Sequence, residues 1–196
     1  IMPHPERTLG NEADDLFKSM RNYMESDDPF SFKSLNFSSK KINIKKFKKP
    51  AKQNEILVST IIADNEAASV EKCINSLGVK AKVKKYLHFE IDAIERLDIN
   101  TIISTDVLFN PSKEYITNIK EGSDIYRFLV RSKDDIVGQS LAQTLQDRFN
   151  LSGLKSIKKG VVWEVKINSS RAKKDVDLIL NSHIFSNPIS QECHEY

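Results

Sequence analysis

The sequence predicts an α+β protein that contains two tandem βαββαβ units. Three landmarks recur in the same order along the chain: a serine within a helical pattern, a Lys-Lys pair followed three residues later by aromatic-Glu-aliphatic, and an Asn-Pro dipeptide. Alternating polar and apolar residues near each Lys-Lys pair predict half-buried strands, and apolar residues at every third or fourth position predict helices. Both copies therefore combine strands with helices.

The spacing of the landmarks indicates an internal duplication. Residues 84–91 align with residues 158–165, an offset of 74 residues from 84 to 158. Ser69 aligns with Ser140 at an offset of 71, and Asn110-Pro111 aligns with Asn187-Pro188 at 77. Offsets that grow slightly from one landmark to the next are what short insertions between repeated elements produce.

The second copy shows the order of elements most clearly. Residues 125–130 form a β-rich run, and Asp134 or Asp135 can cap the following helix. Residues 154–157 and 161–167 predict a β-hairpin with Gly160 at its turn. A helix over residues 176–184 follows, and Asn187-Pro188 is expected to stop it before a last edge strand from Ile189.

The first copy is predicted to match. It has a strand over residues 57–62, a helix with Val70 and Leu77 that Gly78 ends, and a hairpin through Phe89. A second helix is predicted around residues 94–107, and Asn110-Pro111 follows it as a helix stop.

The chain before the repeats divides into two parts. Asn11 can cap a short amphipathic helix with an apolar stripe at Ala13, Leu16, Met20 and Met24. The next residues lose this periodicity and are rich in serine and lysine, which favours a linker. The predicted organisation is an N-terminal segment 1–26, a basic linker 27–53, a first unit 54–120 and a second unit 121–196.

Composition narrows the class of protein. The chain has 196 residues, 39% of them hydrophobic, which allows a buried core, and no apolar run of about 18 residues predicts a membrane span. No signal-peptide pattern begins the chain, so we expect a soluble, cytoplasmic protein. Cys73 and Cys193 are too few for a disulfide framework, and the spacing of His183, Cys193 and His194 does not suit a structural zinc site, so no metal is expected.

One tripeptide near the start of the chain has the form of half an active site. In glutamine amidotransferases that use a cysteine nucleophile, a histidine activates the thiol and a carboxylate orients the imidazole. In His4-Pro5-Glu6 the two side chains lie two residues apart on a segment that proline stiffens. Neither Cys73 nor Cys193 lies in a glycine-rich nucleophile elbow, so this chain alone is not expected to hydrolyse glutamine.

The longer motif around this tripeptide resembles a known family. Residues 2–7 read Met-Pro-His-Pro-Glu-Arg, and an acidic helix containing Leu-Phe-Lys-Ser follows. This run resembles the C-terminal end of the PurQ-type glutaminase of phosphoribosylformylglycinamidine synthase. The resemblance implies that His4 is the general base and Glu6 its orienting carboxylate. Because Ile1 opens the chain within this motif, we expect a piece of a longer protein.

The repeated unit resembles a second component of the same enzyme. Gly160 followed by Glu164, and the late run Asn187-Pro188-Ile189, resemble PurS, the small subunit of the synthase. Val161 and Tyr86 depart from the family, which commonly has lysine and glycine at these positions. The resemblance implies a non-catalytic unit of ferredoxin-like plan that works as a dimer, so two tandem copies would form a covalent pseudo-dimer.

The same resemblance implies partners. PurS joins the glutaminase to an ATP-dependent, PurL-like synthetase and helps shield ammonia passing between them. The expected partners are therefore this synthetase and the rest of the glutaminase domain. ATP and Mg²⁺ would belong to the synthetase, and no cofactor is expected on this chain.

Four strand residues and one helix cysteine carry separate expectations. Glu90 and Glu164 lie on the polar sides of their strands and are candidates for an ammonia path or a subunit contact, although a solvated sheet face is the preferred interpretation. Phe89 and Trp163 occupy inward positions and are expected in the core. Cys73 is expected to be a small core residue on its helix.

Two other functions stay open. Small duplicated α+β units often bind metabolites, so a ligand-sensing or regulatory module is one alternative. The other is nucleic-acid binding through the basic strip at residues 40–49, where lysines flank Ile42, Ile44 and Phe47. A solvated linker is preferred to this second alternative, and no membrane partner is expected.

Overall fold

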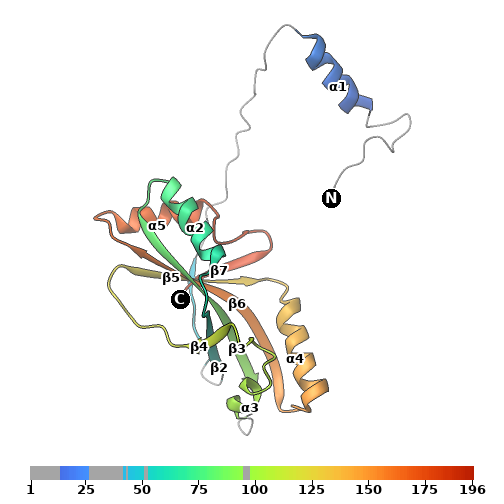
Figure 1. Ribbon diagram of the computed structural model, residues 1–196, viewed down its shortest axis with the longest axis vertical. Coiled ribbons are helices and arrows are strands. Elements are labelled where there is room, and N and C mark those ends of the chain that lie inside the picture. The colour runs from blue at the N-terminus through green and yellow to red at the C-terminus, as the bar shows by residue number, and fades with distance from the viewer. Residues whose placement is uncertain (1–13, 27–41, 43, 51–52, 95–97) are drawn as a thin grey trace. The chain divides into compact units, whose positions relative to one another are not determined.

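The computed structural model describes residues 14–26, 42, 44–50, 53–94 and 98–196 (Figure 1). The chain divides into two compact units, Ile1–Ser38 and Ser39–Tyr196. In the N-terminal unit, Ile1–Ser38, α1 spans Asp14–Glu25 and confirms the predicted helix, with Leu16, Met20 and Met24 exposed. Among the described residues, no helix is long and apolar enough to cross a membrane.

The larger unit, Ser39–Tyr196, is built on one seven-stranded sheet, with strand order β1-β7-β5-β6-β3-β2-β4 (Figure 1). Neighbouring strands are antiparallel except β1 and β7, which are parallel. The long strands β3 and β6 pair at the centre. The bounds are β1 Lys45–Lys46, β2 Asn54–Thr60, β3 Ala81–Ala93, β4 Glu114–Thr117, β5 Ile125–Ser132, β6 Leu154–Ile167 and β7 Gln191–Glu195.

Four helices connect these strands, and aspartates cap three of them. The bounds are α2 Asn65–Ser76, α3 Ile99–Ile103, α4 Ile136–Phe149 and α5 Ala172–Asn181. Asp64, Asp98 and Asp135 each accept a backbone N–H at the start of a helix, a common N-terminal cap. The helix predicted around residues 94–107 is confined to α3.

The predicted hairpins are wrong, because β3 and β6 are each a single long strand. Gly160 lies within β6 and pairs with His88 on one side and Arg131 on the other. A Cβ atom on Gly160 would lie 2.8 Å from Leu129 Cδ1 and 3.1 Å from the Val130 carbonyl oxygen. The glycine therefore permits close packing against β5 and makes no turn. The α+β class is confirmed, but each copy has the order βαβαβ instead of βαββαβ.

The pairing of β3 with β6 gives geometric evidence for the duplication. Leu87 pairs with Val161, and these residues occupy the same position in the two aligned segments. On one side of this pair, Lys84 of the first copy pairs with Glu164 of the second. On the other side, the equivalent residues pair with the copies interchanged, Glu90 of the first with Lys158 of the second. Two antiparallel strands paired in this way are related by a local pseudo-twofold axis at Leu87 and Val161.

The two Asn-Pro dipeptides form matching turns. The Asn110 N–H donates to Glu114 Oε2 and the Asn187 N–H donates to Gln191 Oε1, both at 2.8 Å. The residue after each proline donates its N–H to the asparagine side chain, at 2.9 and 3.0 Å. The expectation that Asn110-Pro111 and Asn187-Pro188 stop helices is wrong, because α3 and α5 end earlier and these turns lead directly into β4 and β7.

The two larger apolar clusters lie between the helices and one face of the sheet, and a third, formed by Leu57, Tyr86, Leu129 and Val162, lies on the opposite face. Of the two larger clusters, one contains residues of α2 from the first copy and α5 from the second, and the other contains residues of α3 and α4. Figure 1 shows α2 near α5, with α3 and α4 towards the opposite end of the sheet. Each of these two clusters thus joins a first helix of one copy to a second helix of the other, so neither copy has a core of its own.

Part of the stretch predicted as a linker belongs to the sheet unit. Lys45 and Lys46 form β1 on the edge of β7, and the Phe47 N–H donates to the Glu195 carbonyl oxygen at 2.7 Å. Ile42 and Ile44 pack against the cluster that contains α2 and α5. Apolar residues at alternate positions among the lysines therefore attach this segment to the fold.

Candidate functional site: the polar face of the sheet

One face of the sheet carries a buried network of charged side chains. Strand alternation directs most apolar residues of β3, β5 and β6 toward the helices, whereas Leu57, Leu129 and Val162 form a small buried cluster with Tyr86 among the charged residues of the opposite face. We call this opposite face the polar face. Its network comprises Glu55 from β2, Tyr86, His88 and Glu90 from β3, Arg127 and Arg131 from β5, Lys158 and Glu164 from β6, and Tyr196 after β7.

His88 is fully buried at the middle of the polar face. Its Nε2 lies 2.5 Å from Glu55 Oε1, and the same oxygen accepts the Tyr196 hydroxyl at 2.7 Å. Arg131 Nη2 lies 3.3 Å from His88 Nδ1. Because a guanidinium can only donate, this contact assigns the acceptor role to Nδ1 and the proton to Nε2, which donates to Glu55.

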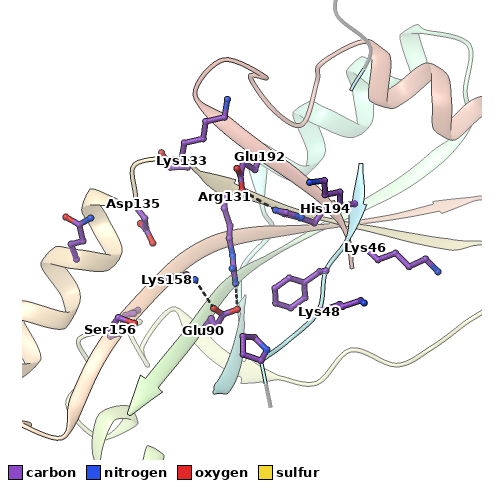
Figure 2. Close-up of a pocket in the computed structure, with 16 residues that line it drawn as sticks. Lys46, Lys48, Glu90, Arg131, Lys133, Asp135, Ser156, Lys158, Glu192 and His194 are labelled. Carbon is purple, nitrogen blue, oxygen red and sulfur yellow. Dashed lines mark hydrogen bonds and ion pairs between the residues drawn. The ribbon is translucent and has the colours of Figure 1, made fainter. Parts of the chain in front are cut away.

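Glu90 joins the two copies through a buried ion pair. Its side chain is 2% exposed, and it accepts Arg131 Nη2 at 2.9 Å and lies 3.5 Å from Lys158 Nζ. Figure 2 shows Arg131 and Lys158 converging on Glu90. A carboxylate removed from water needs such partners, because an unpaired buried charge is costly.

Glu164 has a similar arrangement on the other side of the pseudo-twofold axis. It accepts Arg127 Nε at 2.8 Å, and its side chain is 10% exposed. Arg127 also donates to the Lys120 carbonyl oxygen. The preferred expectation that Glu90 and Glu164 lie on a solvated sheet face is therefore wrong, because both are buried and paired.

Aromatic rings cover the centre of the network. Phe47 stacks on Tyr196 with ring centroids 5.6 Å apart and meets the edge of His88 at 5.7 Å. The Arg131 guanidinium lies 4.9 Å from the Phe47 ring centroid, within the range of a cation–π contact. Phe47, directly after β1, therefore covers His88 and contacts the Arg131 guanidinium.

The network fixes the charge states of three groups. Burial raises the pKa of Glu55, but hydrogen bonds from His88 and Tyr196, with the charge of Lys49, together lower that pKa below its ordinary value. Burial and the bond to Glu55 raise the pKa of Tyr196 far above the usual phenol value, and burial beside Glu164 raises the pKa of Tyr86 to about 12. At neutral pH Glu55 is ionised and both phenols keep their protons.

The residues singled out from the sequence fall into three groups. Glu90, Gly160 and Glu164 lie together on the polar face. Asn110-Pro111 and Asn187-Pro188 lie in the turns before β4 and β7, away from this network. His4 and Glu6 lie outside the described residues.

Sequence reasoning missed the partners of these carboxylates. Arg127 and Arg131 stand four residues apart in an otherwise apolar strand, a spacing that places both on one face of a sheet. His88 lies two residues before Glu90 and so shares its face. These periodicities were available in the sequence. No comparable signal linked Phe47 and Tyr196, which are distant in the chain and meet only through the β1–β7 pairing.

The expectations for the remaining residues have mixed outcomes. Phe89 and Trp163 are buried in the core, as predicted. Cys73 is exposed instead of buried, so the prediction for it is wrong. The helix predicted over residues 176–184 ends earlier, at Asn181, so that His183 follows α5 with a left-handed φ of 58°. Within the described ranges, no group of three or more His, Cys, Asp and Glu side chains is arranged to hold a metal ion.

Two comparisons with known proteins leave the family of this chain unassigned. No family model matches the sequence, and no curated protein matches it. The fold and the polar face define only a class: an α+β protein whose two repeated halves share one sheet and bury a charged network across their junction.

Proposed function

We propose that this chain is a non-catalytic assembly component of phosphoribosylformylglycinamidine synthase. In this role it joins a glutaminase to the ATP-dependent, PurL-like synthetase and shields ammonia that passes between them. The observation that carries the proposal is the pseudo-twofold pairing of β3 with β6, together with the resemblance of the second copy to PurS, which the repetition extends to the first copy.

The duplicated architecture supports a bridging role. The family that the copies resemble works as a dimer, and here the two halves share one sheet and two interleaved cores. Such a unit presents two related surfaces, one on each side of the axis. Because the copies differ in sequence, the two surfaces can take different partners.

The N-terminal motif supports the assignment to this enzyme. By resemblance, His4 acts as the general base of the glutaminase and Glu6 orients it, while the nucleophilic cysteine belongs to a part of that domain absent from this sequence. On this proposal the chain contributes to a glutamine-dependent ligase without completing either active site by itself. ATP and Mg²⁺ bind to the synthetase partner.

Co-purification tests the bridging role. The protein that contains this chain is mixed with the synthetase and glutaminase in the presence of ADP and glutamine. The mixture is then analysed by size-exclusion chromatography. The proposal predicts one complex that contains all three components. Failure of the chain to co-elute with the synthetase would contradict it.

A His4→Ala variant separates assembly from catalysis. The assembled variant enzyme is expected to form the same complex and to lose glutamine-dependent amidine formation, because the thiol lacks its base. It should keep the activity supported by added ammonia, since the synthetase site is unchanged. Equal loss of both activities in an intact complex would argue against the role assigned to His4.

A further inference from the structure

A pocket of about 610 Å³ opens beside the polar face, where the second copy meets the segment around β1 (Figure 2). Its walls come from residues 45–50, the end of β5 and the start of β6, and β3 contributes Glu90. We call it the basic pocket. A volume of this size is typical of sites for small ligands.

The charge of the basic pocket is positive. Its cations are Lys45, Lys46, Lys48, Arg131, Lys133 and Lys158, and they outnumber its carboxylates, Glu90, Asp135 and Glu192. These carboxylates already have partners. Glu90 pairs with Arg131 and Lys158, Asp135 accepts two backbone N–H groups, and Glu192 lies 3.5 Å from His194.

Several cationic groups in the pocket lack a partner. Within the part of the chain that the structure describes, Lys45, Lys46 and Lys48 form no ion pair. Arg131 Nε is buried and makes no hydrogen bond there, although the guanidinium is fixed by Glu90, His88 and Phe47. A buried N–H donor without an acceptor is costly, and an anion in the pocket would supply one.

The pseudo-twofold axis provides an internal comparison. His88 and Val162 are equivalent, so their partners Leu57 and Leu129 are equivalent too, and Ser59 in β2 therefore corresponds to Arg131 in β5. A second pocket of about 300 Å³ lies at the corresponding position of the first copy and is lined by Ser59 and Lys84, the counterpart of Lys158. We call it the matching pocket.

The matching pocket has equal numbers of cations and carboxylates, Lys84 and Lys85 against Asp64 and Glu71, although Asp64 Oδ2 is buried without a hydrogen bond. Its Lys85 lies 3.3 Å from Asp64 Oδ2 and 2.5 Å from Glu66 Oε2. Serine replaces the buried arginine, and among the described residues no counterpart of β1 lies beyond β4 at this edge of the sheet. The excess of unpaired cations is therefore a property of one copy and does not follow from the repeated backbone.

We propose that the basic pocket binds a small phosphorylated metabolite. Unpaired lysines and a fixed guanidinium suit a phosphate group, while Pro50, Ile157 and the hydroxyls of Ser132 and Ser156 offer contacts to the rest of the ligand. Phe47 already packs on Tyr196, His88 and Arg131, so the pocket lacks a free aromatic platform of the kind that binds single-stranded nucleic acid. The site does not depend on the bridging role.

Isothermal titration calorimetry with matched probes tests this site. AMP and glycerol phosphate are compared with adenosine and glycerol, which lack the phosphate, each at up to about 1 mM ligand. The proposal predicts one-to-one binding of a phosphorylated probe and no heat from its neutral match. Equal binding within each matched pair, or no binding by either phosphorylated probe, would overturn it.

Two double variants locate the binding. Lys45→Gln with Lys48→Gln is expected to weaken binding of the phosphorylated probe by about tenfold or more, because two charges facing the ligand are removed. Lys84→Gln with Lys166→Gln removes the same charge from exposed strand positions outside the basic pocket and should leave affinity unchanged. Near-ultraviolet circular dichroism of Trp163 checks that both variants fold.

The same variants distinguish a phosphate site from binding that depends on net charge and from a site for a macromolecule. If both double variants lose affinity equally, binding reflects net charge and the proposal fails. The proposal also fails if neither phosphorylated probe binds, whereas an RNA oligonucleotide or an acidic peptide binds the native chain and loses affinity for the Lys45/Lys48 variant. In that case the strip would serve a macromolecular partner.

Discussion

The two copies have closely similar backbones but differ in the charges that they place on the polar face. Ile74 and Leu145 are equivalent core residues, and Asp64 and Asp135 are equivalent helix caps. In contrast, Glu55 in the first copy corresponds to Arg127 in the second, and Ser59 corresponds to Arg131. Caps, turns, core residues and the glutamates Glu90 and Glu164 agree between the copies, so the main difference on the polar face lies at these positions of β2 and β5.

The largest expected effect comes from the shared cores. Ile74→Ala and Leu145→Ala each remove a fully buried side chain at equivalent positions and should each lower the free energy of unfolding by about 2–5 kcal/mol. Because the cores are interleaved, both variants should shift one common transition. Denaturant unfolding followed by Trp163 fluorescence and by far-ultraviolet circular dichroism measures this. Separate transitions in either variant would show that the copies are independent.

The next effect concerns the buried carboxylates. Glu90→Gln removes the charge facing Arg131 and Lys158, and should cost about 1.5–3 kcal/mol. Among the described residues Glu164 forms an ion pair with Arg127 alone, so Glu164→Gln is expected near the lower end of that range. Urea unfolding compares the two. A larger loss for Glu164→Gln would contradict the account of Glu90 as the more strongly paired residue.

A smaller and equal effect is expected at the two Asn-Pro turns. Asn110→Ala and Asn187→Ala each delete a side-chain acceptor for the backbone N–H two residues later, at a cost of about 0.5–1.5 kcal/mol. Thermal unfolding of both variants gives the comparison. Markedly unequal losses would mean that the turns are matched in geometry but not in energy.

The smallest effect is a pH dependence confined to the first copy. Since the pKa of Glu55 is lowered in the folded state, its contribution is complete above the unfolded value of about 4.3 and is lost as pH falls through the lowered pKa. Glu55→Gln should flatten this part of the stability profile, measured by urea unfolding from neutral to acidic pH. Identical slopes for the native chain and Glu55→Gln would contradict the assignment.

The sequence predicted the α+β class, the duplication and the order of the landmarks, because periodicity and repetition are local signals. It did not predict that β3 and β6 run on as single strands. Glycine is frequent in turns, so Gly160 predicts a turn, whereas the structure requires glycine there because the side chain of Leu129 on the neighbouring strand leaves no room for a Cβ atom. A contact between strands leaves no trace in the spacing of one strand.

The polar face was predictable in part. Alternation placed Glu90 and Glu164 on the polar sides of their strands, and the same rule applied to Arg131 would have supplied a partner for Glu90. The burial of these charges was not predictable, because it depends on Phe47 and Tyr196 arriving from distant parts of the chain. The basic strip looked like a linker for the same reason: its attachment depends on the edge of β7.

Native-state hydrogen exchange tests most directly whether the copies form one unit. The amides of β2 and β3 in the first copy and of β5 and β6 in the second are followed in the unmodified chain. Interleaved cores predict that the slowest amides in both copies exchange through the same global opening, with equal free energies. A clearly lower opening free energy for the slowest amides of one copy would show that it unfolds alone, and would contradict the shared-core account.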